Sequence, residues 1–228
     1  MGTLKGSILS RSNHSGKGFK AQRQGLIEEW LKKYDIQNYT INDDFTVDVD
    51  RDVNLSVIDL KEFPEYIQFG VVRGNFNCSS NNLTSLRGCP REVRRYFDCS
   101  SNELTSLEGA PERVEGSFDC SYNELTSLKG APETVKGNFI CSRNKLTSLE
   151  GAPEKVGRDF VCSNNQLTSL KEAPKRVEGN FYCYNNQLIS LEGGPKEVSG
   201  TFFCSNNGIK FTEEDVRKVC RVKEKICC

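Results

Sequence analysis

The sequence predicts a solenoid, in which similar coils stack on one another and share one continuous core. The main observation is a strict period of 21 residues that holds for seven cysteines, each preceded two places earlier by phenylalanine. An asparagine stands three places after every one of these cysteines. One coil cannot bury its apolar side alone, so neighbouring coils must stack. The cysteines are Cys78, Cys99, Cys120, Cys141, Cys162, Cys183 and Cys204.

The Phe-x-Cys segment predicts the strand of each coil, since side chains two residues apart point to the same side. Leucines that follow the asparagine extend the same core, and a Pro-x-x-Val segment returns the chain along the opposite side. Stacking places the strands about 4.8 Å apart in a parallel sheet. Val53, Leu55, Leu60 and Phe63 fit a degenerate first coil, so we expect residues 53–211 to form about eight repeats.

A column of charged residues independently supports this stacking. The residue nine places after six of the cysteines alternates in sign from one coil to the next. In a stack, each of these side chains lies between two opposite charges. The column consists of Arg87, Glu108, Lys129, Glu150, Lys171 and Glu192.

The repeat resembles a known family. The run Phe-x-Cys-Ser-x-Asn-x-Leu-Thr-Ser-Leu looks like the leucine-rich-repeat core, with Phe and Cys in the first two apolar places. Its short period and the proline in each turn are similar to repeat proteins of bacteria and their phages. Over roughly residues 50–210 the resemblance implies a leucine-rich-repeat solenoid, mostly β, with a parallel sheet on a concave face. It also implies that the asparagines satisfy backbone groups, and that the function is binding.

The N-terminal part predicts a cap on the first coil. Residues 1–19 carry lysine and arginine without acids and predict a flexible basic tail. Residues 20–52 predict a helix over 24–34 followed by one or two strands over 39–55. The helix would place one apolar stripe against the array, formed by Leu26, Ile27, Trp30, Leu31 and Tyr34.

Residues 212–228 predict a C-terminal cap helix and a tail. Thr212 followed three places later by Asp215 is typical of a helix start. Val216, Val219 and Cys220 continue this helix, and residues 221–228 are expected to fray. The terminal Cys227-Cys228 resembles a double-cysteine prenylation end, which stays open as a less favoured alternative.

The cysteine column predicts buried, reduced thiols. Stacked residues on parallel strands keep their Cβ atoms farther apart than a disulfide prefers, although disulfides remain the alternative. Free thiols favour a reducing cytoplasm. The cysteine spacing is unlike that of a zinc site, and the chain has a single histidine.

A second candidate metal site is an alternating run that mimics a calcium loop: Asp48, Asp50, Asp52, Asn54, Ser56 and Asp59. Val53 occupies the place that such a loop reserves for glycine, so we favour a strand and expect no metal.

Composition excludes several classes of function. The formal net charge is zero, so no global field favours nucleic acid or a membrane surface. No apolar run approaches the ~18 residues of a membrane span. With neither a G-x-S-x-G motif nor a phosphate loop, the sequence predicts a non-enzymatic protein without a cofactor.

The variable positions predict a surface that binds a protein partner. The residue before each cysteine points outward, and along the array this column changes from acidic to apolar and aromatic. We expect a partner with a basic part and an apolar part. One alternative is that residues 221–228 cover the patch in a monomer. The other is that a second copy covers it, in a weakly self-associating structural component of a virus particle or cell surface. The predicted site comprises Asp98, Asp119, Tyr122, Ile140, Arg143, Val161, Tyr182, Tyr184 and Phe203.

Overall fold

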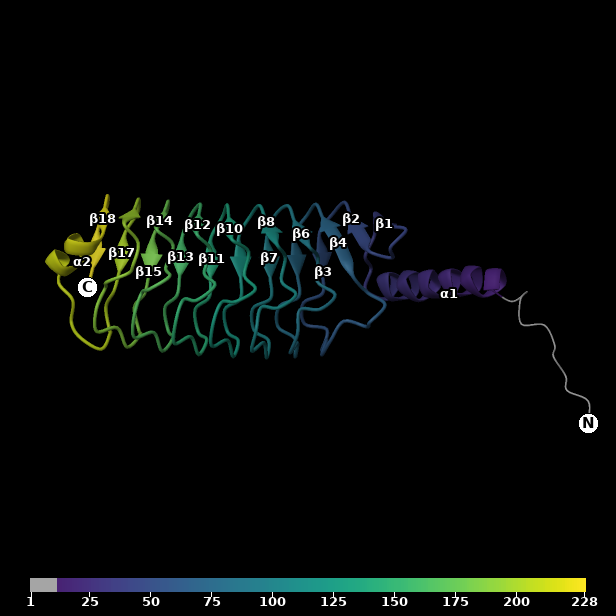
Figure 1. Ribbon diagram of the computed structural model, residues 1–228, viewed down its shortest axis with the longest axis horizontal. Helices are drawn as coiled ribbons and strands as arrows, with labels where there is room; N and C mark the ends of the chain where they lie inside the picture. The colour runs from purple at the N-terminus through teal and green to yellow at the C-terminus, as the bar shows by residue number, and fades with distance from the viewer. Residues whose placement is uncertain (1–11) are drawn as a thin grey trace, which may run out of the picture.

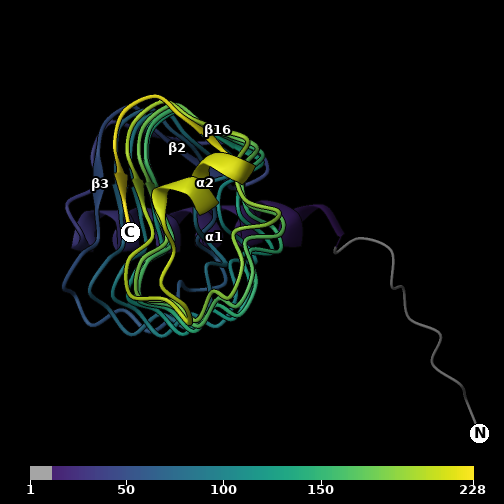
Figure 2. The same cartoon turned by 90° about the vertical axis from the view of Figure 1, so that its left-hand side faces the viewer.

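The computed structural model describes residues 12–228, which form a parallel β-solenoid with a 22-residue helix leading into it (Figure 1). Each coil contributes one short strand to each of two sheets, and the coils superimpose when viewed along the stack (Figure 2). The predicted solenoid and its period are therefore confirmed.

The predicted Phe-x-Cys strands form one of the two sheets, which we call sheet B. In the described residues it has nine strands, and every neighbouring pair is parallel and in register, so that phenylalanine lies beside phenylalanine from β5 to β17 and beside Val53 and Ile226 at the two ends. The strands are β3 Val53–Asn54, β5 Phe76–Asn77, β7 Phe97–Asp98, β9 Phe118–Asp119, β11 Phe139–Ile140, β13 Phe160–Val161, β15 Phe181–Tyr182, β17 Phe202–Phe203 and β19 Ile226–Cys227.

The second sheet, sheet A, is formed by the returning Pro-x-x-Val segments. It has ten strands in the described part of the chain, parallel except for the hairpin of β1 with β2. The strands are β1 Tyr39–Ile41, β2 Val47–Val49, β4 Phe69–Val72, β6 Glu92–Val93, β8 Arg113–Val114, β10 Thr134–Val135, β12 Lys155–Val156, β14 Arg176–Val177, β16 Glu197–Val198 and β18 Arg221–Val222.

This second sheet corrects the expectation of one sheet on a concave face. Strands pair at the same spacing of about 4.8 Å on both sides of each coil. Neither side is therefore longer than the other, and Figure 1 shows coils stacked along a nearly straight axis. The outward surface of sheet B is a flat side of the solenoid.

The core consists of identical side chains stacked along the axis. The rings of the phenylalanine column are fully buried, and from Phe76 to Phe181 their centroids lie 5.2–5.7 Å apart with interplanar angles of 7–25°. The cysteine and leucine columns are buried beside them. A stack of apolar columns gives every coil the same contacts with its neighbours, which explains the strict period.

The asparagine column satisfies backbone groups between coils, as predicted. Asn102 Nδ2 donates to the carbonyl oxygens of Cys78 and Cys99, both at 3.1 Å. Its Oδ1 accepts from the Leu83 N–H at 2.9 Å, so one buried side chain pairs three backbone groups of two coils.

The N-terminal helix α1, Ser12–Lys33, begins earlier than expected, and most of the predicted basic tail, residues 1–11, lies outside the described residues. Ile27, Trp30 and Leu31 are buried, and the Trp30 ring lies 6.2 Å from the rings of Phe63 and Phe69. Residues 39–55 form three short strands, one more than predicted: β1 and β2 form a hairpin with Phe45 in its turn at φ 66°, and the chain then crosses to the other sheet as β3.

The C-terminal segment differs from its predicted frayed state. Helix α2, Glu213–Val219, begins at the predicted Thr212, whose side chain accepts from the Asp215 N–H in a capping box. Beyond α2, β18 and β19 pair with β16 and β17 and form one further coil. Backbone pairing therefore orders residues 221–228, and sheet B has one strand more than the predicted eight repeats.

The alternating charge column forms one ion pair among the described residues, between Lys129 Nζ and Glu150 Oε1 at 2.9 Å. The remaining members are exposed on the turns and extend into solvent. The sign alternation reflects the register of the coils more than a continuous ladder of contacts.

Candidate functional site

The residues predicted before each cysteine form one straight row along the outer surface of sheet B. The register pairs Asn77 with Asp98, Asp98 with Asp119, and Asp119 with Ile140. It continues through Val161 and Tyr182 to Phe203. We call these seven residues the sheet B row; the two-residue strands place each of them on the solvent side.

The C-terminal half of the row is apolar and aromatic. The rings of Tyr182 and Phe203 stack with centroids 4.6 Å apart and an interplanar angle of 5°, and Tyr184 packs edge-on against Tyr182 at 6.4 Å. Side chains at this spacing shield one another, so Ile140, Val161 and both tyrosines are half-buried. The patch is more continuous but less exposed than the sequence suggested.

The N-terminal half of the row carries two adjacent carboxylates. Within residues 12–228, Asp98 and Asp119 form no ion pair, and Tyr96 Oη donates to Asp119 Oδ2 at 3.2 Å. Burial raises the pKa of Asp119, and the neighbouring Asp98 raises it further. Burial likewise raises the pKa of Tyr96. A cation placed here would relieve the repulsion between the two acids.

Tyr96 was missed by the sequence analysis. The place before each phenylalanine is polar and small in the neighbouring coils, as at Asn75, Ser117 and Asn138, where the side chain accepts from a backbone N–H of the next coil. Tyr96 is the aromatic exception in this column. That departure from the pattern was the available signal.

The two acids also have a local structural role. Asp98 Oδ1 and Asp119 Oδ1 each accept at 2.9 Å from the N–H two residues later, which closes the turn after the strand. Asn77 Oδ1 makes the same 2.9 Å bond in the coil before them. The turn therefore does not need a negative charge at this place, and the later coils form it with Ile140, Val161, Tyr182 and Phe203 there.

Tyr122 and Arg143 lie beside the row and contact each other. The Arg143 guanidinium lies 5.0 Å from the centre of the Tyr122 ring. Both residues have φ 54°, in the left-handed region, where the corresponding places in later coils carry Asn164, Asn185 and Asn206. Asparagine tolerates this backbone well, so Tyr and Arg are there at a conformational cost.

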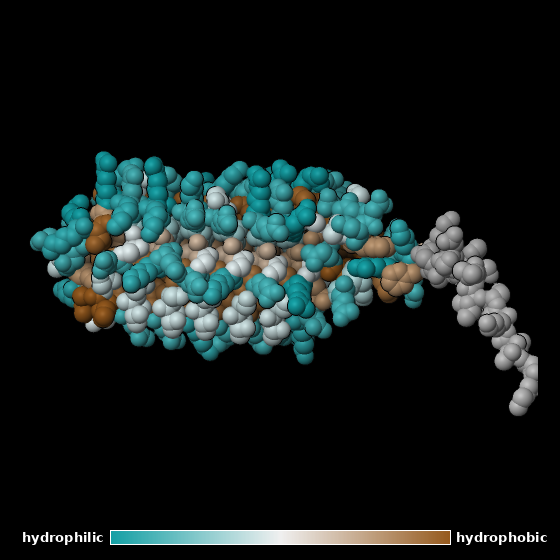
Figure 3. Space-filling view, in the orientation of Figure 1, coloured by the Kyte–Doolittle hydropathy of each residue, from teal (hydrophilic) through white to brown (hydrophobic). Residues whose placement is uncertain are grey.

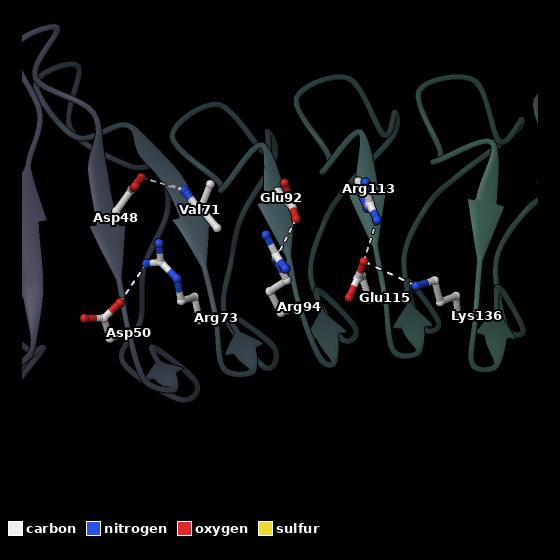
Figure 4. Close-up of polar contacts among 9 residues, drawn as sticks. All are labelled: Asp48, Asp50, Val71, Arg73, Glu92, Arg94, Arg113, Glu115 and Lys136. Atoms are coloured by element: carbon white, nitrogen blue, oxygen red, sulfur yellow. Dashed lines mark hydrogen bonds and ion pairs between the residues drawn. The ribbon is translucent and has the colours of Figure 1, made fainter.

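On sheet A, by contrast, several acidic side chains pair with basic ones. Figure 4 shows Arg94 beside Glu92 at 2.7 Å, and Glu115 between Arg113 and Lys136 at 2.6 and 3.3 Å. The hydrogen bonds from Arg113 and Lys136 lower the pKa of Glu115 and so stabilise its negative charge.

A depression of about 1000 Å³ lies along sheet A, away from the predicted site. Val135, Val156 and Ala173 contribute to its lining, together with charged residues such as Lys155 and Glu172. Figure 3 shows a pale band of residues of intermediate hydropathy that runs along the molecule between hydrophilic margins. The surrounding acids and bases are mixed, and they define no single ligand chemistry.

The C-terminal segment does not cover the row. Phe203 pairs in register with Cys227, so β19 adds one more half-buried position to the end of the row. The alternative in which residues 221–228 fold over the aromatic patch is therefore wrong, because these residues extend sheet B edgewise.

The calcium-like run is distributed over the strands of the first coils. Asp48 Oδ1 accepts from the Val71 N–H at 2.9 Å, and Asp50 forms a 2.7 Å ion pair with Arg73 (Figure 4). Asp52 Oδ1 accepts from the Asn75 N–H at 2.7 Å. In residues 12–228, no cluster of three His, Cys, Asp or Glu side chains could hold a metal ion.

The chain is a parallel β-solenoid repeat protein. The outer surface of its sheet B carries two adjacent acids that form no ion pair within residues 12–228. Comparison of the sequence with protein-family models and with curated proteins finds no match. Within residues 12–228, neither α1 nor α2 combines the length and the hydropathy of a transmembrane helix.

Proposed function

We propose that the chain is a non-enzymatic binding module that holds a protein partner on the sheet B row. One observation carries the proposal: Asp98 and Asp119 lie side by side with no cationic partner among residues 12–228, whereas acids of sheet A such as Glu92 and Glu115 pair with basic side chains. A stack of half-buried aromatic rings continues the same row, and such residues are enriched as interface anchors.

The charge of the two acids is the strongest part of the argument. Asn77 shows that an uncharged amide closes the same turn, so the turn gives no reason for carboxylates at 98 and 119. Like charges on directly opposed positions destabilise a sheet by a few tenths of a kcal/mol or more. A basic group of a partner would turn this cost into an attraction.

The row also specifies the spacing of the partner's groups. Three coil steps separate Asp119 from Tyr182, which corresponds to roughly 14 Å at the strand spacing of a sheet. An extended segment spans this distance in about four residues. The partner that fits is a protein segment with lysine or arginine at one end and aromatic or branched apolar side chains at the other.

The proposal has several wider parts. We infer that the chain is a leucine-rich-repeat variant of bacterial or phage type that works in a reducing cytoplasm, supported by its repeat motif and its free thiols. We also infer that α1 and α2 cap the solenoid, since Trp30 packs on Phe63 and Phe69, and Val216 of α2 is fully buried.

The first test uses labelled extended peptides with two lysines followed, four residues on, by two aromatic residues, and measures their affinity by fluorescence anisotropy. Tyr182→Ala and Phe203→Ala are each expected to weaken binding at least tenfold, as about 1.4 kcal/mol of lost contact would. Ile189→Ala is the matched control, because Ile189 is also apolar, 67% exposed, and lies off the row.

Asp119→Asn keeps the turn-closing oxygen and removes the negative charge. It should therefore weaken peptide binding and make the affinity less dependent on the salt concentration. Unchanged affinity of all three row variants, with intact circular dichroism, would rule out this surface. Concentration-dependent size-exclusion profiles that the row variants abolish would instead identify a second copy as the occupant and overturn the external partner.

A further inference from the structure

The cysteine column changes its contacts at the last coil. Cys78 Sγ donates to the Asp98 carbonyl oxygen at 3.4 Å, and Cys183 Sγ donates to that of Phe203 at the same distance. Cys204 departs from this pattern: its Sγ lies 3.1 Å from Cys228 Sγ. The last two members of the column therefore face each other sulfur to sulfur.

The register of β19 explains this contact. Phe203 pairs with Cys227, so the next residues, Cys204 and Cys228, lie opposite each other. Opposed positions on paired strands are about 4.8 Å apart, which lies within the Cα separation of about 4.4–6.8 Å that a disulfide needs. The inner cysteines are packed between coils on both sides, whereas Cys228 is exposed and its side chain is free to turn.

One member of the sulfur pair, Cys228, is accessible to solvent, and Cys204 lies directly beneath it. A depression of about 300 Å³ is lined by Cys204 and Cys228 together with Asn206, Lys210 and Phe211. Cys204 is 1% exposed and the earlier cysteines of the column are fully buried, so a reagent in solvent reaches Cys228 first and not the rest of the column. The ammonium group of Lys210 favours an anionic reagent at the same place.

We propose that Cys204 and Cys228 are a redox site, which small anionic disulfides such as oxidised glutathione convert into an intramolecular disulfide that latches the last coil. This inference is independent of the proposed partner.

The chemistry balances through two thiol–disulfide exchanges. The Cys228 thiolate attacks one sulfur of oxidised glutathione, forms a mixed disulfide and releases one glutathione thiolate. Cys204 then gives its proton to solvent base and attacks Cys228 Sγ, which expels the second glutathione. Two protein thiols are oxidised and one glutathione disulfide is reduced to two thiols. Burial raises the pKa of Cys204, so the exposed Cys228 attacks first.

The disulfide would restrain the edge of sheet B. β19 pairs only with β17 in the described chain, so this one pairing holds β19 in sheet B. A covalent bond between Cys204 and Cys228 closes the intervening segment, including α2 and β18, into a loop that cannot peel away.

The test incubates the full-length reduced protein with oxidised glutathione and maps its peptides under non-reducing conditions by mass spectrometry. The expected product is a monomer lighter by two hydrogens, in which peptides carrying Cys204 and Cys228 are linked. Amide hydrogen exchange at β19 should slow roughly tenfold or more on oxidation and recover with dithiothreitol.

Matched variants decide the assignment. Cys228→Ser should abolish the link and the slowing, whereas Cys227→Ser, next to it on β19, should retain both. A link through Cys227, a stable glutathione adduct on Cys228, covalent dimers, or unchanged exchange at β19 would each overturn the latch. Cys228 is exposed, so its serine variant is expected to fold, and circular dichroism checks this.

Discussion

At the scale of single residues, the repeat imposes one backbone conformation on whatever side chain the sequence supplies. The second place after each cysteine adopts φ between 51° and 56° from Ser80 to Asn206. Asparagine occupies this place in the last three coils, where side-chain bonds of 2.9 and 3.0 Å join Asn164, Asn185 and Asn206. The left-handed conformation belongs to the coil geometry, and residues unsuited to it pay a conformational cost.

Val57 is the clearest case of such a cost. It occupies this place in the first coil with φ 57°, and its side chain is 76% exposed, so packing does not compensate. Val57→Asn is expected to raise the free energy of unfolding by about 1 kcal/mol, measured by urea titration followed by circular dichroism.

Ser80→Val, one coil further along at φ 54°, is the reverse control and should lower stability by a similar amount. If neither substitution moves the urea midpoint, the left-handed strain assigned to this column is absent.

At the scale of elements, strand pairing and helix docking decide which segments are ordered. Residues 221–228 have weak strand signals of their own, yet β18 and β19 find complementary edges on β16 and β17. Helix α1 similarly depends on the first coil, because its buried residues Ile27, Trp30 and Leu31 contact the array. Both ends are stabilised by the solenoid more than by local preference.

Trp30→Ala tests this dependence at the N-terminal end. The ring is 6% exposed and packs against Tyr34, Phe63 and Phe69, so its loss should cost about 3–5 kcal/mol of unfolding free energy. Phe19→Ala on the same helix is the control, since Phe19 is 63% exposed and should change little. Equal losses for the two variants in thermal unfolding would argue against docking of α1 through Trp30.

At the scale of the whole molecule, the solenoid is a one-dimensional array whose coils contact only their neighbours. Deletion of residues 121–141 removes one complete period and joins Cys120 to Ser142, so both sheets remain continuous. We expect this shortened protein to fold with its secondary structure per residue unchanged in circular dichroism. The distance between Asp119 and the aromatic residues of the row decreases by about 4.8 Å. The shortened protein should therefore prefer peptides in which the lysines and the aromatic residues are closer together.

Deletion of residues 131–141 removes fewer residues but takes out β10 and β11 while retaining both leucine segments. Each sheet is then interrupted, and the surplus segment must loop out. This variant should unfold at a lower urea concentration than the complete-period deletion, and the opposite order would contradict the one-dimensional picture of its stability.

Periodicity made most of the fold predictable. Columns of Phe, Cys, Asn and Leu identify inward positions, because an interior position must satisfy the same contacts in every coil. The candidate row followed from the same logic, as the outward place between Phe and Cys. The hydrogen bond from Tyr96 to Asp119 could not be derived, since it depends on which side chains meet between coils.

The sequence by itself determined the period, the inward and outward faces, and the order of acidic and aromatic residues along the row, because each of these is a spacing along the chain. The tertiary structure alone decided that the return segment forms a second sheet, that the axis is straight, and that the last eight residues complete a coil. Those features depend on hydrogen bonds between backbones distant in sequence, which are satisfied only when neighbouring coils are in place.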